Sequence, residues 1–497
     1  MSQEKLIQRM QQANFYHHPV KEPIEIIQTH CSIVFLTGNY AYKMKKMVDF
    51  GFLDYSTLAK RQHFLSVELE MNKQIAPDLY LEVLPIYEEN NNFYWQEQGQ
   101  IKEYVLKMNQ FPQENLLLNI YQQGNLTSQH MKELGKLVAK FHRNTFTNDY
   151  ITSFGTPEKI GESISQNYEQ TQKYIGIAQN QKQYEQTKAF TDNFLHNYRD
   201  VLEKRQIDHK IKECHGDLHL KNICIWQDKI QLFDRIEFNE PFRFVDVMYD
   251  VAFTVMDLDS KGEKTLANVF LNTYLEETGD WEGVQVLPLY LSRQAYVRAK
   301  VTSLLLDDKA ISEEEKVKAK ETAAAYYHLA WQYTQPSQGK IIMMSGLSGS
   351  GKTTIATKKA RGLNAIHIRT DAVRKHLANI PLQDKGKKEI YSQAMTAKTY
   401  QKLLDLAQIL TIQGFTVILD GKFDRICWRQ PVLEFALNHN IEFEIIYCHA
   451  PLDVLQHRLR QRNNDISDAT PELLKQQQKQ QEDFTDKEKP FLKRGLT

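Results

Sequence analysis

The sequence predicts two regions of different fold class: an α+β region with a small sheet lobe and a helical lobe, followed by an α/β region with a parallel sheet. Closely spaced strand patterns occupy the part before residue 110, and mostly helical patterns follow them. Beyond residue 339, strand and helix patterns alternate, which is typical of a parallel sheet with crossover helices. We assign residues 1–335 to the first region and residues 336–497 to the second.

The N-terminal sheet is predicted from a three-strand meander between residues 24 and 44. Its segments IEIIQ, IVFLT and YAYKM are separated by a turn at residues 29–32 and by the pair Gly38-Asn39, both of which tolerate positive φ. Leucine spacing then predicts a helix over residues 56–75. The strand-like segments LEVLPIY, FYWQEQ and IKEYVLKM complete the sheet.

The sequence also predicts helices after the sheet and the position where the first region ends. MKELGKLVAKFHRN has a strong amphipathic pattern, and residues 181–206 are polar but periodic, which indicates a solvated helical hairpin. A helix ends near Trp331, and the polar segment QYTQPSQGK, with Pro336 and Gly339, separates it from the apolar strand IIMMS. The second region is therefore expected to start at this segment.

In the second region the predicted strands are IIMMS, AIHIR, FTVILD and FEIIYC, with helices between them. The segment after Gln481, EDFTDKEKPFLKRGLT, offers no convincing fifth core strand. Whether the C-terminus completes the sheet, and with it the adenine contacts usual at that end of such a sheet, is therefore left open by the sequence.

The composition and the net charge exclude several classes of function and partner. Hydrophobic residues make up 41% and charged residues 25%, which is ordinary for a globular protein, and no apolar stretch approaches the ~20 residues of a membrane-spanning helix. The polar start, MSQEKLIQRMQQ, lacks a secretory core, so we expect a cytoplasmic protein with no membrane partner. With 62 basic and 62 acidic side chains, net charge is zero, which argues against nucleic acid as the partner. The five cysteines form no C-x-x-C pair, which disfavours zinc and disulfides.

The most informative motif of the first region is HGDLHLKN, residues 215–222, followed by Leu232-Phe233-Asp234. Phosphoryl transfer needs a carboxylate that orients the attacking hydroxyl and accepts its proton, and oxygen ligands that hold Mg²⁺ on the phosphates. Asp217, Asn222 and Asp234 supply that set.

The pattern H-G-D-x-x-x-x-N with a strand-end Asp resembles the aminoglycoside phosphotransferase and choline kinase branch of the protein-kinase-like fold, over residues 1–335. The resemblance implies that Asp217 is the catalytic base and that Asn222 and Asp234 are metal ligands. Asp250, in the segment Asp250-Val251-Ala252, would then have a structural role. Because Asp234 is followed by Arg235-Ile236, the activation switch of regulated protein kinases is not implied.

Upstream, Ala41-Tyr42-Lys43 resembles the strand-three lysine of kinases, and Glu68 in the next helix is the predicted ion-pair partner of Lys43. Glu70 competes with Glu68, since the helix register is open within one turn. The alternative for Lys43 is a solvated lysine in the basic run KMKK. No G-x-G-x-x-G is present, so the turn at residues 29–32 is the predicted phosphate-covering element.

The second region carries GLSGSGKT, residues 346–353, which matches G-x-x-x-x-G-K-[ST] in full between a strand and a helix. Lys352 is predicted to reach the β- and γ-phosphates, and Thr353 to ligate Mg²⁺. The predicted nucleotide-binding residues are Gly346, Ser348, Gly349, Ser350, Gly351, Lys352, Thr353 and Thr354. Asp420 ends an apolar strand and is a second candidate for metal binding. The alternative is an aspartate in the turn that ends the strand.

The residues around this loop resemble those of small P-loop kinases such as gluconate, shikimate and polynucleotide kinases and zeta-type toxins. That resemblance implies that Asp371, three residues before Arg374, meets the acceptor hydroxyl; the alternative is a helix N-cap. Arg458 and Arg462, one turn apart before NNDISDA, look like the lid arginines that neutralise the transferring phosphate.

The tandem resembles bacterial fusion proteins that join an aminoglycoside phosphotransferase-like domain to a P-loop ATPase or kinase domain. Three functional hypotheses remain open. The first is a bifunctional kinase that uses ATP and Mg²⁺ at both sites to phosphorylate a hydroxyl of a small molecule. The second is a nucleotide-sensing switch with one non-catalytic domain, and the third is an RNA or nucleotide-end kinase, which the neutral charge opposes. The acceptor does not follow from the fold.

Overall fold

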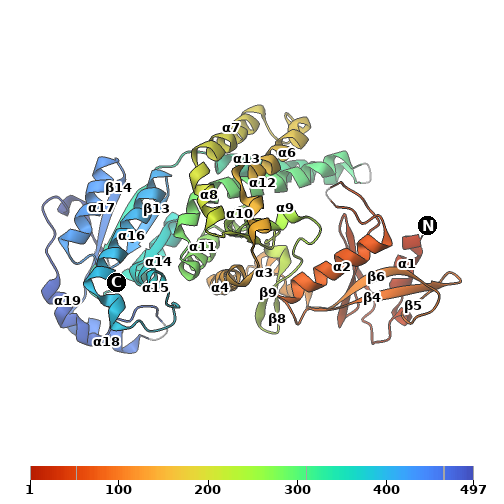
Figure 1. Cartoon of the computed structure of the whole chain (residues 1–497), viewed down its shortest axis with the longest axis horizontal. Helices are drawn as coiled ribbons and strands as arrows, with labels where there is room; N and C mark the ends of the chain where they lie inside the picture. The colour runs from red at the N-terminus through yellow and green to blue at the C-terminus, as the bar shows by residue number, and fades with distance from the viewer. Residues whose placement is uncertain (1, 52, 309–310, 463–464, 496–497) are drawn as a thin grey trace. The chain divides into compact units, whose positions relative to one another are not determined.

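The computed structural model describes residues 2–51, 53–308, 311–462 and 465–495 (Figure 1). The chain forms two compact units whose segments alternate along the sequence. The first comprises Met1–Leu126, Asn144–Ser163 and Glu203–Thr254, and the second comprises Thr127–Arg143, Ile164–Leu202 and Val255–Thr497. The domain boundary placed at residues 335 and 336 stays a prediction.

The first unit contains a six-stranded antiparallel sheet of order β1-β2-β3-β6-β4-β5. The strands are β1 Glu25–Gln28, β2 Ser32–Leu36, β3 Tyr40–Lys45, β4 Tyr80–Glu89, β5 Asn92–Tyr94 and β6 Gln100–Asn109. The predicted meander is confirmed, as is the helix that follows it, α2 Leu58–Lys73. The sheet buries Phe35, Met44 and Val105 in a core that also receives Leu6 and Met10 from α1 Ser2–Met10.

Two short strand pairs also belong to the first unit. β7 Ile211–Glu213 pairs with β10 Phe244–Asp246, and β8 Ile223–Trp226 pairs with β9 Lys229–Leu232, both antiparallel. These pairs flank the loop that carries the first motif and the aspartate after β9. They therefore set the positions of the predicted catalytic and metal-binding side chains.

Helices make up most of the chain between β6 and residue 332. They are α3 Leu117–Gln122, α4 Ser128–Asn144, α5 Asp149–Thr152, α6 Pro157–Thr171, α7 Gln181–Asn197, α8 Arg199–Ile207, α9 Glu240–Arg243, α10 Val247–Asp259, α11 Lys264–Thr278, α12 Leu287–Leu304 and α13 Glu313–Gln332. The amphipathic pattern of α4 buries Met131, Leu134 and Val138, and α7 and α8 are the two helices of the polar segment predicted to be helical. Among the helices of the described ranges, none is long and apolar enough to cross a bilayer.

The second unit contains a five-stranded parallel sheet of order β12-β13-β11-β14-β15. Its strands are β11 Lys340–Ser345, β12 Ile366–Arg369, β13 Thr416–Asp420, β14 Glu442–Cys448 and β15 Leu492–Gly495. The helices around it are α14 Lys352–Leu363, α15 Thr370–Leu377, α16 Gln393–Ile412, α17 Ile426–Asn438, α18 Leu452–Gln461 and α19 Leu474–Gln480 (Figure 1). Ile342, Met344, Ile418 and Ile446 form its buried centre. The α/β prediction is confirmed.

The segment after Gln481, which has no convincing strand pattern, does complete the sheet with a fifth strand. β15 pairs with β14, with Leu492 opposite Ile445 and Gly495 opposite Cys448. The strand escapes pattern analysis because it is short, lies at the sheet edge and carries exposed Lys493 and Arg494. Backbone pairing holds it there, together with the ion pair of 3.1 Å between Lys493 and Glu444.

Candidate functional site

The strand-three lysine lies in an ion-pair cluster. The Lys43 Nζ is 2.6 Å from Glu68 Oε1 and 2.5 Å from Asp234 Oδ1. The pairing with Glu68 is thus the predicted one, whereas Glu70 is exposed. Burial lowers the pKa of Lys43, but the two carboxylates outweigh burial and hold that pKa well above its usual value. Lys43 is therefore a largely buried ammonium on an inner strand of the sheet and not a solvated lysine.

Asp234 lies just beyond β9 in a left-handed backbone conformation, with φ +63°. Its backbone N–H donates to the Tyr80 hydroxyl at 2.9 Å, which fixes this conformation. Burial raises the pKa of Asp234, but the charge and hydrogen bond of Lys43 outweigh burial and hold it below its usual range. The side chain is 42% exposed, so an ionised carboxylate is accessible as a metal ligand.

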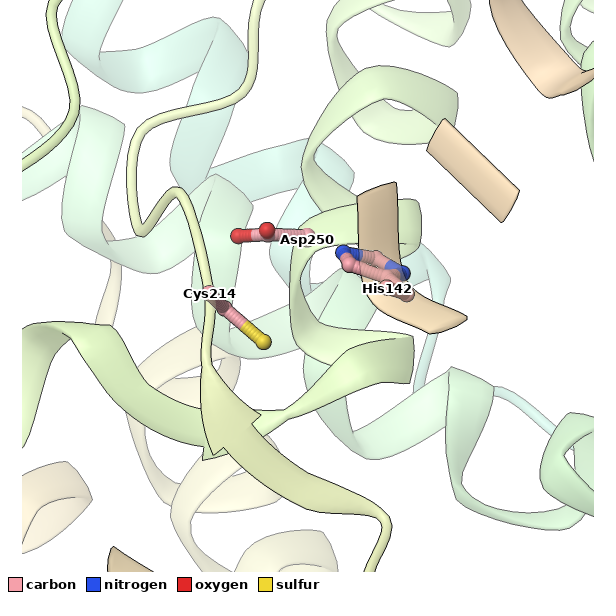
Figure 2. A group of neighbouring side chains, drawn as sticks. All are labelled: His142, Cys214 and Asp250. Carbon is pink, nitrogen blue, oxygen red and sulfur yellow. The ribbon is translucent and has the colours of Figure 1, made fainter. Parts of the chain in front are cut away.

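The loop with the H-G-D motif is held by Asp250 of α10. The backbone N–H groups of His215 and Gly216 donate to the Asp250 carboxylate at 2.7 and 2.8 Å. Figure 2 shows Asp250 pointing toward the chain just beyond Cys214, where this loop begins. Gly216 has φ +84°, and a Cβ there would lie 2.7 Å from the Phe242 carbonyl oxygen, so the turn requires glycine. Asp250 therefore positions the loop, in line with the structural role that the resemblance implied.

Asp217 and Asn222 are joined within this loop. The Asn222 Nδ2 donates to the Asp217 Oδ2 at 2.9 Å and to the Asp217 carbonyl oxygen at 3.0 Å. Because Nδ2 is engaged, Oδ1 is the atom of Asn222 suited to a metal ion. The His219 Nε2 lies 3.3 Å from the same Asp217 oxygen, and the Asp217 side chain is 37% exposed. An acceptor hydroxyl can thus reach this carboxylate.

The turn between β1 and β2 is closed on itself. The Ser32 N–H donates to the Thr29 Oγ1 at 2.9 Å, and the Thr29 N–H donates to the Ser32 carbonyl oxygen at 2.9 Å. The turn is ordered by these bonds, and its phosphate-covering role stays a prediction.

The P-loop connects β11 to α14 and requires its glycines. Gly346, Gly349 and Gly351 have φ of +136°, +81° and +88°, and a Cβ at Gly346 would lie 2.2 Å from the Cys448 carbonyl oxygen. The Ser350 Oγ is buried and has no hydrogen-bond partner within the described part of the chain. Such an unpaired hydroxyl in a glycine cradle fits the oxygens of a bound phosphate.

The Lys352 ammonium, buried in this loop, donates to the Leu347 carbonyl oxygen at 2.7 Å. Burial lowers its pKa, and the nearby Asp420 and Asp371 carboxylates offset part of that effect. Thr353 is half-buried and Thr354 is exposed on α14. Among the predicted nucleotide contacts, Ser348 is already bonded to Gln477 of α19, through its N–H and its hydroxyl, at 3.1 Å each.

Asp420 is a buried residue and not a surface turn. It accepts a hydrogen bond from the His367 Nε2 of β12 at 3.0 Å. Burial raises the pKa of Asp420, but the His367 hydrogen bond and the neighbouring cations keep it below its usual range. The partner His367 went unnoticed in the sequence, where it is only one residue of a four-residue strand. An ionised carboxylate here suits a metal-bound water near the P-loop.

Asp371 and Arg374 have different surroundings in α15. Arg369 is the N-cap of this helix, so Asp371 lies in its first turn and the N-cap alternative is not what the structure has. Arg374 is buried, and its Nη1 donates to the Ile390 carbonyl oxygen at 3.0 Å and to the Thr396 hydroxyl at 3.1 Å. Arg374 thus anchors α16, whereas Asp371 is, beside Asp420, one of two carboxylates whose charge acts on Lys352.

The two predicted lid arginines also differ. The Arg458 Nη1 lies 3.4 Å from the Gly349 carbonyl oxygen of the P-loop, and the side chain is exposed. The Arg462 Nη2 donates to the carbonyl oxygens of Ser467 and Ala469 at 3.0 and 2.8 Å. Arg462 therefore shapes the lid segment, whose residues 463–464 lie outside the described ranges.

Comparison with known proteins identifies one of the regions. Residues 341–484 match the model of the AAA domain family. The C-terminal part of the chain is a P-loop domain of this type. The predicted order of an α+β region followed by an α/β region with a parallel sheet is therefore confirmed.

The curated relatives are similar along nearly the whole chain. Uncharacterized proteins of Mycobacterium tuberculosis (strain H37Rv) and Mycobacterium bovis are each 26% identical over 465 residues, which cover 92% of this chain and 90% of theirs.

Solved structures are similar to separate parts of the chain. An APS kinase of Mycobacterium tuberculosis is 26% identical with a TM-score of 0.22, over 25% of this chain and 71% of that one. An amicoumacin kinase is 10% identical with a TM-score of 0.41, over 66% and 94%. A choline kinase of Cryptosporidium parvum is 10% identical with a TM-score of 0.40, over 67% and 95%.

Proposed function

We propose that this chain is a bifunctional ATP-dependent phosphotransferase that moves the γ-phosphate to a hydroxyl of a small molecule. Its two domains are residues 1–335 and 336–497, each with a Mg-ATP site, and we assign the reaction to the cytoplasm, where ATP is made. The observation that carries the proposal is the assembled set at the first site. Lys43, Glu68 and Asp234 lie within ion-pair distance, and Asp217 and Asn222 lie within hydrogen-bond distance.

At the first site each residue has a defined task. Lys43, oriented by Glu68, holds the phosphates of ATP, and Asp234 and Asn222 hold Mg²⁺. Bound Mg²⁺ neutralises the charge that develops on the phosphoryl oxygens. Asp217 accepts a hydrogen bond from the acceptor hydroxyl, orients its oxygen toward the γ-phosphate and takes its proton late in the reaction.

At the second site the glycine-rich backbone surrounds the phosphates with N–H groups, and Lys352 moves from the Leu347 carbonyl oxygen to the phosphate oxygens. Thr353 and the buried Asp420 would hold Mg²⁺. Asp371 receives the acceptor hydroxyl, and Arg458, beside the P-loop, stabilises the transferring phosphoryl group.

A nucleotide-sensing switch is the second candidate, because α11 contacts the P-loop domain within the second unit. The Asn272 Oδ1 accepts the His367 N–H at 2.7 Å, and the Glu276 Oε1 lies 3.5 Å from the Arg369 Nη1. These contacts are made by β12, which leads directly into the first turn of α15, where Asp371 lies. Nucleotide binding at the P-loop would in this case act on α11 without phosphorylating a free substrate.

Nucleotide titration of two single variants tests the proposal. Asp234→Asn keeps a residue that tolerates φ +63° but removes the charge, and Lys352→Ala removes the P-loop ammonium. The wild type should bind two equivalents of Mg-ATP, and each variant should bind one.

Two matched variants serve as controls. Asp228→Asn changes an exposed aspartate that also has positive φ, and Lys358→Ala changes a lysine on α14 outside the P-loop; both should keep two sites. Loss of all binding in Lys352→Ala would refute an ATP site in the first domain and favour the switch.

A further inference from the structure

A second lysine lies in the ion-pair cluster of the first site. Lys45 follows Lys43 by two residues on β3, so both side chains project from the same face of the strand. The Lys45 Nζ is 2.6 Å from Glu68 Oε2 and also donates to the Glu237 Oε1. Glu68 therefore receives a lysine on each oxygen, Lys43 on Oε1 and Lys45 on Oε2.

Glu237 ties the segment after Asp234 to this lysine. Its Oε1 accepts a second hydrogen bond from the Tyr55 hydroxyl at 2.5 Å, and its backbone carbonyl oxygen accepts one from the Arg243 Nη1 at 2.7 Å. The Lys45 Nζ lies 4.9 Å from the centre of the Tyr55 ring. The Lys45 ammonium of β3 thus joins two other parts of the chain. One is α2, through Glu68, and the other is the segment three residues beyond the metal-binding Asp234, through Glu237.

The cluster is buried and nearly balanced in charge. The side chains of Lys45, Glu68 and Glu237 are only 2%, 0% and 4% exposed. Burial lowers the pKa of Lys45, but Glu237 and Glu68 outweigh burial and raise it above its usual value. Removing such charges from water costs free energy, and a buried ion pair is weak evidence for added stability. The contacts of this cluster bear instead on the geometry of the site.

The next residue along the chain is also locked. The Arg235 side chain is fully buried and donates to the carbonyl oxygens of Met71 and Glu213 at 3.0 and 2.8 Å. The Asp234 segment is therefore attached to α2 on one side and to β7 on the other. In regulated kinases the lysine–glutamate pair and the metal-binding aspartate are brought into place by a switch. Here they are held by fixed contacts.

We propose that Lys45 and Glu237 are a positioning pair that fixes Glu68, and through it Lys43, in the phosphate-binding geometry, so that the first site is assembled before nucleotide arrives. Both residues would act through Glu68, since the side-chain contacts of Lys45 and Glu237 are with protein groups. The inference rests on the proposed ATP site of the first domain.

The test uses the full chain with Lys352→Ala, so that only the first site binds nucleotide. Lys45→Met/Glu237→Gln removes one positive and one negative charge and leaves the net charge of the cluster unchanged. The measured quantity is the ratio of Mg-ADP to adenosine affinity by calorimetry, because only the phosphates use Lys43. In a folded double variant, the ratio of Mg-ADP to adenosine affinity should fall roughly 10-fold. A fall of this size corresponds to the loss of one charge-assisted hydrogen bond to the phosphates.

A matched control is Lys102→Met/Glu88→Gln, which removes an ion pair between β6 and β4 on the outer part of the same sheet. It should leave the ratio unchanged. If the double variant does not fold, Glu237→Gln alone carries the test, since it keeps the volume and the Tyr55 contact while weakening the anchor of Lys45. In that variant the ratio of Mg-ADP to adenosine affinity should fall several-fold.

The outcomes separate this inference from the proposed function. An unchanged ratio in a folded variant, with Mg-ADP bound by the Lys352→Ala parent, overturns the positioning role and leaves the ATP site intact. No Mg-ADP binding by that parent overturns the first site, and the positioning role with it.

Discussion

Replacing Asp217 with asparagine tests the chemistry of the first site most directly. The substitution keeps the shape of the side chain and removes its negative charge. The introduced amide would still offer its Oδ1 as an acceptor to the Asn222 Nδ2, which now lies 2.9 Å from the carboxylate. Because the side chain is 37% exposed, we expect the free energy of unfolding to change by less than about 1 kcal/mol.

The effect on turnover should be much larger. A positioned general base contributes about 10² to 10⁴ in rate, which corresponds to roughly 3 to 5 kcal/mol of transition-state free energy. In the proposed mechanism ATP is held by Lys43 and by the metal on Asp234, whereas Asp217 acts on the acceptor. The dissociation constant of Mg-ATP should therefore stay within about twofold.

The assay uses Lys352→Ala as the parent, so that turnover at the P-loop does not mask the loss. A metabolite library is first screened by mass spectrometry for ATP-dependent gain of a phosphate, and kcat is then measured for the acceptor found. Asp228→Asn, at an exposed turn, is the control for an asparagine substitution as such. Unchanged kcat in Asp217→Asn would mean that this residue is structural, and the catalytic role of the whole H-G-D segment would be refuted.

Three further results are expected. EDTA should abolish phosphotransfer and Mg²⁺ should restore it, since the proposed ligands Asn222, Asp234 and Thr353 offer oxygen atoms; restoration by Zn²⁺ alone would contradict this assignment. Arg429→Met should lower the free energy of unfolding by about 3 to 5 kcal/mol in urea titrations, because it leaves Glu488, only 2% exposed, buried without its cation at 2.7 Å. Arg429→Met/Glu488→Gln should recover part of that loss, and equal stability of the two variants would argue against the ion pair as the cause. Affinity for RNA should be weak in filter binding, given 62 basic and 62 acidic side chains; tight binding with a steep salt dependence would favour the RNA-end kinase.

Much of the site was predictable because its residues lie in short motifs. The spacing of Asp217 and Asn222 within one loop brings them into contact, and the glycines around Lys352 allow only a tight loop before a helix. The choice of Glu68 over Glu70 needed the helix register, which the spacing of apolar residues left open. The role of Arg374 was not readable, since its partners in η8 Lys388–Tyr391 and α16 are brought near only by the fold.

The sequence by itself determined the two fold classes, because strand and helix periodicities and the glycine loop are local properties of the chain. It also determined which side chains are candidates for the phosphoryl chemistry, because those residues sit at fixed spacings. Only the tertiary structure decided that β15 completes the parallel sheet and that Lys45 joins Glu68 to Glu237. An edge strand is held by backbone pairing, and Lys45 and Glu237 are 192 residues apart, so neither leaves a pattern that local spacing can reveal.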